Sequence, residues 1–159
     1  MRNRKTVAQR TDEIEWADYP RIMPGEYTAY CSSATNYYDA AFKRWTCILR
    51  FNVLCDNGDL LACIPMWLSL GTSNKPRAGR RGKYFPEWIR ANGGAPTRGD
   101  RLSPRIFRRR FARVEVGDTT RGPAPYSVVK KILFWETGGG VTQSGSQPVN
   151  DGKREGPQD

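Results

Sequence analysis

The most regular pattern of hydrophobic and polar positions covers residues 44–55. Every second residue there forms one mostly apolar face: Trp45, Cys47, Leu49, Phe51, Val53 and Cys55. The opposite face is more polar: Arg44, Thr46, Ile48, Arg50, Asn52 and Leu54. Successive side chains of a strand point to opposite sides of a sheet, so the pattern predicts a long strand with one face against a core.

The residues after this strand predict a hairpin. Residues 56–59 read Asp-Asn-Gly-Asp, and Asn-Gly tolerates the positive φ angles of a tight turn. Residues 60–70 are then the returning strand, in which Pro65 indicates an edge or a bulge because proline cannot donate a backbone hydrogen bond.

Weaker patterns predict the remaining elements. Strands are expected over residues 26–31, 106–116 and 126–135, and a polar hairpin loop over residues 32–41. A short helix is expected over residues 84–92, because Tyr84, Trp88 and Ile89 recur at three-to-four spacing and Gly93-Gly94 follows.

The predicted order is therefore β-β-β-α-β-β. We expect a mainly β fold, a five-stranded OB-fold-like barrel with one short helix, since the OB-fold places its helix between strands 3 and 4. The domain is expected over residues 24–136, preceded by an N-terminal arm (residues 1–23) and followed by a disordered Gly/Ser/Pro-rich tail (residues 137–159).

Charge changes the picture because it is concentrated in one part of the chain. The net charge is +10, and residues 75–113 alone carry 13 basic and 2 acidic side chains, so the rest of the chain is close to neutral. A surface that serves only solubility usually mixes both signs. The arginine-rich band therefore predicts a nucleic-acid-binding surface.

The absence of certain residue types argues against several other functions. The chain has no histidine, which excludes Ser-His-Asp, Cys-His and His-metal chemistry. Its four cysteines are Cys31, Cys47, Cys55 and Cys63, and none form the close pairs of a zinc site. We expect no enzyme activity, metal or cofactor, and we interpret the cysteines as small buried residues on strands. No apolar run reaches the roughly 18 to 20 residues that span a bilayer, so a cytoplasmic protein without a membrane partner is expected.

An OB-fold binds oligonucleotides on its strand 2–3 face, between the loops joining strands 1–2 and 4–5. The binding residues predicted from this rule and from the basic band are Tyr37, Tyr38, Arg44, Arg50, Trp67, Lys75, Arg77, Arg80, Arg81, Lys83, Arg108 and Arg110. Tyr37, Tyr38 and Trp67 fit stacking on bases or simple packing. Trp45 and Trp88 fit the core better than a stacking site.

Several segments resemble small OB-fold single-stranded-DNA-binding proteins of phages and mobile elements. The segments are Pro24-Gly25-Glu26-Tyr27, residues 45–53, the helix with Trp88 before Gly93-Gly94, residues 111–116 and residues 126–129. The resemblance covers roughly residues 24–135. It implies binding and protection of single-stranded DNA in replication or recombination, often with self-association and with replication or recombination proteins as partners.

The tail departs from that family, in which many members end in an acidic tail that recruits partners. The tail of this chain mixes signs: Asp151, Lys153, Arg154, Glu155 and Asp159. Two other functions stay open from the sequence: an RNA-binding OB module, and a basic accessory subunit of a larger nucleoprotein or protein complex. A carboxylate enzyme is a third alternative, and the main argument against it is that the sequence shows no convincing pair of acidic residues.

Overall fold

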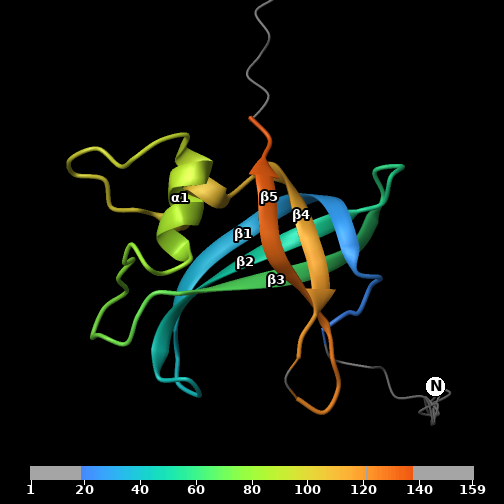
Figure 1. Cartoon of the computed structure of the whole chain (residues 1–159), viewed down its shortest axis with the longest axis horizontal. Coiled ribbons are helices and arrows are strands. Elements are labelled where there is room, and N and C mark those ends of the chain that lie inside the picture. The colour runs from blue at the N-terminus through green and yellow to red at the C-terminus, as the bar shows by residue number, and fades with distance from the viewer. Residues whose placement is uncertain (1–18, 121, 138–159) are drawn as a thin grey trace, which may run out of the picture.

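The computed structural model describes residues 19–120 and 122–137 (Figure 1). Most of the predicted arm and tail lies outside these residues. The elements are β1 (Gly25–Asp39), β2 (Arg44–Leu54), β3 (Leu60–Ser69), α1 (Tyr84–Asn92), the 3-10 helix η1 (Pro104–Phe107), β4 (Arg110–Asp118) and β5 (Ser127–Trp135).

All five strands belong to one antiparallel sheet with the order β3-β2-β1-β4-β5. The sheet is curled, so that β4 and β5 cross over β1, β2 and β3 (Figure 1). The end strands β3 and β5 approach each other, but no backbone pairing joins them within the described residues. The predicted mainly β architecture of five strands and one helix is confirmed, whereas the sheet is not closed into a barrel.

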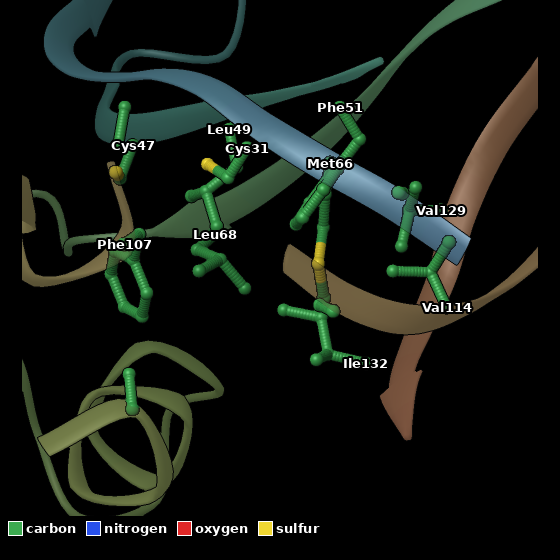
Figure 2. Close-up of a cluster of buried hydrophobic side chains, with 14 of the residues drawn as sticks. Cys31, Cys47, Leu49, Phe51, Met66, Leu68, Phe107, Val114, Val129 and Ile132 are labelled. Carbon is green, nitrogen blue, oxygen red and sulfur yellow. The ribbon is translucent and has the colours of Figure 1, made fainter. Parts of the chain in front are cut away.

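The core lies between the two halves of the curled sheet. In Figure 2, Phe51 of β2 and Met66 of β3 meet Val114 of β4 and Ile132 of β5. The inner face of β2 is the predicted one, with four fully buried residues at alternate positions: Cys47, Leu49, Phe51 and Val53. Burial of such side chains contributes roughly 1.5–3 kcal/mol each, which fixes the register of the strand.

The helix α1 has the predicted bounds and covers one end of the sheet (Figure 1). Its Trp88 is buried, as expected, and the indole Nε1 donates to the Ser103 carbonyl at 3.1 Å. The Tyr84 ring packs edge-on against Phe107 of η1, with 5.7 Å between centroids. Gly93 ends the helix in the left-handed conformation, with φ 77°.

Two predicted boundaries are wrong. Residues 32–39 continue β1 instead of forming a loop, because they pair with β2 as far as the Asp39–Arg44 register. The fourth strand begins at Arg110 and not at residue 106, since Pro104–Phe107 form η1. Arg109 has φ 58°, which breaks the strand alternation that the sequence predicts for this segment.

The cysteines are all free thiols. Cys31 and Cys47 are buried on strands as expected, and Cys55 is half-buried, but Cys63 is exposed because it lies on the outer face of β3, opposite Asn52. Among the described residues, no helix is long and apolar enough to cross a membrane.

Candidate nucleic-acid interface

A groove opens where β3 and β5 are not paired. Its volume is about 530 Å³, and its walls come from the end of β1, the β1–β2 loop, β2, β3, the end of the β3–α1 loop, the β4–β5 loop and β5. The polar and aromatic side chains of its lining include Tyr19, Tyr37, Asp39, Phe42, Arg44, Thr46, Trp67, Lys83, Tyr126 and Lys130. A cavity of this size is in the range of ligand sites, which span roughly 300–1,000 Å³.

One wall of the groove is set by a tight β1–β2 turn. The Asp39 carboxylate Oδ1 accepts hydrogen bonds from the backbone N–H groups of Ala41 (3.0 Å) and Phe42 (3.3 Å). A short side chain that binds its own backbone in this way stabilises a turn. The turn places the Arg44 guanidinium over the Phe42 ring, 5.1 Å from the centroid. The result is a cation held against an exposed ring at the rim of the groove.

Aromatic rings gather around Trp67. Tyr19 meets the Trp67 ring edge-on at 5.7 Å, and Tyr126 does so at 6.2 Å. Tyr19 and Tyr126 stack on each other at 4.9 Å. Burial, and then the nearby Asp39 carboxylate, raise the pKa of the Tyr37 hydroxyl above its usual value.

The segment before β1 brings Tyr19 to this cluster. The Ile22 N–H donates to Ser127 Oγ at 2.8 Å, and the Ser127 N–H donates to the Pro20 carbonyl at 3.1 Å. Arg21 forms an ion pair with Asp118 at 2.9 Å. These contacts fasten residues 20–22 along the start of β5, so Tyr19 lies at the groove.

A second, smaller cavity of about 430 Å³ continues from the first along the outer face of β2. Tyr19, Tyr37 and Trp67 line both cavities, while Ile48 and Arg50 line only the smaller one. Arg50 is exposed. The two cavities together therefore form one path over β2 and β3, with cations at both ends.

Two polar atoms of the path have no hydrogen-bond partner among the described residues, namely Arg44 Nε and Thr46 Oγ1. Thr46 is only 3% exposed although it lies on the outer face of β2. Buried polar groups are usually paired, and those that are not point to sites with an additional partner.

The structure brings five of the predicted residues together on this path: Tyr37, Arg44, Arg50, Trp67 and Lys83. Tyr38 lies on the opposite face of β1 because neighbouring strand residues alternate. Its ring contacts Trp45 edge-on at 5.6 Å. Trp45 itself is half-buried against the core.

The other predicted loop cations lie outside the two cavities. These residues are Lys75, Arg77, Arg80 and Arg81, and all are exposed. The loop bends back at Gly71, which has φ 84°, and the Arg77 N–H donates to the Leu70 carbonyl at 2.8 Å. Only the last cation of this loop, Lys83, reaches the groove.

Arg108 and Arg110 bind the protein's own backbone. Arg108 donates from Nε (3.0 Å) and Nη2 (2.7 Å) to the Ala34 carbonyl. Arg110 Nη1 donates to the carbonyl of Ala91, and its guanidinium lies 5.3 Å from the Trp135 ring centroid. Neither residue lines the two cavities.

Sequence reasoning missed Tyr19, Thr46, Tyr126 and Lys130. Tyr126 carried a signal, since it begins the last predicted strand beside the β4–β5 loop that an OB-fold uses for binding. Thr46 also carried one, since the alternation of residues 44–55 places it on the same strand face as Arg44 and Arg50. Tyr19 and Lys130 carried none, because only the curl of the sheet brings the segment before β1 and the start of β5 next to β3.

The described residues contain no group of three or more potential metal ligands. No protein-family model matches the sequence, and no curated protein is significantly similar to it.

Proposed function

We propose that this chain is a non-enzymatic binder of single-stranded nucleic acid, with DNA as its ligand, and that it supports replication or recombination. The observation that carries the proposal is the path that the groove and the smaller cavity form together. It combines two rings, Tyr37 and Trp67, with the cations Arg44, Arg50 and Lys83. Binding without sequence preference needs this combination of cations for the phosphates and rings for the bases.

The strand arrangement supports an OB-type fold. The order β3-β2-β1-β4-β5, with β3 and β5 close but unpaired, is that of a five-stranded barrel left open at one seam. OB-folds bind oligonucleotides over strands 2 and 3, between the 1–2 and 4–5 loops. The groove of this chain has walls from the same places: Phe42 in the β1–β2 loop, and Thr119 and Thr120 before β5.

The chemistry of binding follows from the two kinds of side chain. Stacking of a base on an aromatic ring contributes about 1–3 kcal/mol. Arginine supplies a planar fork that contacts phosphate oxygens and also stacks. We expect the phosphates to follow the Arg44, Arg50 and Lys83 side of the path and the bases to face the rings.

The test is a fluorescence-anisotropy titration of labelled oligo(dT) at several salt concentrations. Affinity should fall with a log–log slope of about −0.7 per phosphate contacted. The double variant Arg44→Ala/Arg50→Ala should bind more weakly, with a slope shallower by about 1.4. The matched control Arg98→Ala/Arg101→Ala removes the same charge from exposed loop positions outside the two cavities and should keep the wild-type slope.

Flat salt dependence, or tighter binding of duplex than of single strands, would contradict the proposal. Competition with oligo(rU) of equal length distinguishes DNA from RNA. Weak binding of every oligonucleotide, together with strong co-purification of a protein complex, would instead favour the accessory-subunit function.

A further inference from the structure

A second aromatic surface lies on the outer face of β1, β4 and β5, apart from the groove. It consists of Tyr30, Phe111 and Phe134, which we call the aromatic platform. Phe111 is 43% exposed and Phe134 is 54% exposed, although both lie within strands. The Tyr30 and Phe111 rings contact each other, with 5.0 Å between centroids. Large exposed apolar groups that cluster in this way mark interaction sites.

The strand register connects this platform to the groove. Tyr30 lies opposite Asn52 of β2, two residues along the same outer face from Arg50. On its other side, Tyr30 lies opposite Phe111 of β4, and Phe134 of β5 lies opposite Arg113. Trp67 on β3 is level with Thr35 of β1, whereas Phe134 on β5 is level with Thr28. With about 4.8 Å between strands and about 3.3 Å per residue, the two rings are roughly 19 Å apart across the strands and roughly 20 Å apart along them.

Charge on this face favours an anionic partner. Arg50 is exposed beside the platform, and the half-buried Arg113 next to Phe111 is held by a 3.3 Å hydrogen bond from Nη1 to Thr28 Oγ1. The carboxylates of Glu26 and Glu115 lie opposite each other farther along β1 and β4, away from Tyr30. A nucleic-acid strand alternates bases with phosphates, and rings interleaved with arginines match that alternation. They match an aliphatic protein surface less well, because such a surface offers no negative charge to the arginines.

We propose that the aromatic platform is a second base-stacking site for the same single strand, which therefore crosses the outer face of the sheet from β3 to β5. This inference rests on the proposed function. It assigns Tyr30, Phe111 and Phe134 as stacking residues in addition to those of the groove, and it predicts a binding site longer than the groove alone.

The experiment measures the affinity of the full chain for dT4 and dT16. The double variant Phe111→Ala/Phe134→Ala should bind dT16 at least about tenfold more weakly, because two stacking contacts are lost. Its affinity for dT4, which the groove alone accommodates, should stay within about twofold of wild type. Phe111→Tyr/Phe134→Tyr keeps both rings and should retain dT16 binding. The control Met23→Ala/Leu60→Ala removes two exposed apolar side chains outside the platform and should change neither affinity.

Unchanged dT16 binding by the alanine variant would overturn the platform while leaving the groove proposal intact. Sedimentation of the same proteins without oligonucleotide detects the competing explanation. A wild-type dimer that the alanine variant dissociates, with dT16 affinity unaffected, would make this face a contact between two copies. Absence of wild-type binding to both dT4 and dT16 would overturn the proposed function together with the platform.

Discussion

The arginine side chains of this protein fall into two groups that differ in their surroundings. Arg44 and Arg50 line the cavities beside aromatic rings, where a phosphate can approach. Arg108 and Arg110 instead donate to carbonyls of the protein's own backbone. These hydrogen bonds hold both guanidinium groups against the protein and leave fewer of their five N–H donors for a phosphate.

Arg108 therefore provides a prediction at the residue scale. Replacement Arg108→Ala should lower the free energy of unfolding by about 1–3 kcal/mol, because the carbonyl of the buried Ala34 loses both of its guanidinium donors. Urea denaturation measures this loss. Arg105→Ala, at an exposed position of η1, is the control and should leave stability nearly unchanged. An unchanged stability of the Arg108 variant with a shallower salt slope for oligo(dT) would assign it to the binding site instead.

Single residues were predictable only where local pattern decides their surroundings. Trp88 lies on the apolar side of a short helix, and its burial followed from the spacing. Tyr37 and Tyr38 could not be separated, because both were assigned to a loop. Their assignment to opposite faces depends on β1 pairing with β2 up to Asp39, which is a long-range interaction.

At the element scale, α1 shows how strongly local signals can specify a helix. Four local signals predict the same helix. They are its apolar spacing, the acidic Glu87 in the first turn, the basic Arg90 in the last turn and the Gly93-Gly94 pair at its end. β1 shows the opposite case. Residues 32–36 read Ser-Ser-Ala-Thr-Asn, which resembles a loop, yet the neighbouring strand β2 provides the hydrogen bonds that extend β1.

A substitution at Gly93 tests whether local backbone conformation determines where α1 ends. Replacement Gly93→Ala should destabilise the protein by about 1–2 kcal/mol, since its φ of 77° lies in the left-handed region that disfavours a Cβ atom. No atom lies within 4 Å of the added Cβ, so the cost is conformational and not a clash. Thermal unfolding of the two single variants, Gly93→Ala and Gly94→Ala, measures the difference in their stability. Gly94 has no positive φ and the same open space, so equal stability of the two variants would contradict this account.

At the scale of the whole molecule, the buried thiols link stability to pH. Burial raises the pKa of Cys31 to about 12, with the neighbouring Cys47 adding to the effect, and burial raises the pKa of Cys47 to about 12. The unfolded chain releases these protons near the ordinary value of 9.0. An acid whose folded pKa is raised stabilises the fold below the unfolded pKa, and that contribution is lost as pH rises toward the folded value.

We therefore expect the urea concentration at the midpoint of unfolding to decrease as the pH is raised from 8 to 11. The variant Cys31→Ala/Cys47→Ala, although less stable overall, should show a smaller fall across this range. Thiol titration of the native protein at pH 8 should modify the exposed Cys63 and spare Cys31 and Cys47, which react only after unfolding. Equal pH dependence of the two proteins would refute the linkage.

The sequence by itself determined the elements whose signals lie within a few residues. Alternation over residues 44–55 predicted β2 and its core face, and spacing predicted α1, because the periods of strand and helix follow from backbone geometry. It also located the basic band, since charge is a property of composition.

The tertiary structure alone decided which of these residues meet. The curl of the sheet leaves the seam between β3 and β5 unpaired, and this opens the groove at Trp67 and Tyr126. It also directs Lys83 into the groove while Arg108 turns to the carbonyl of Ala34. These positions depend on contacts between segments far apart in the chain, and a local pattern of hydrophobic and polar residues does not encode them.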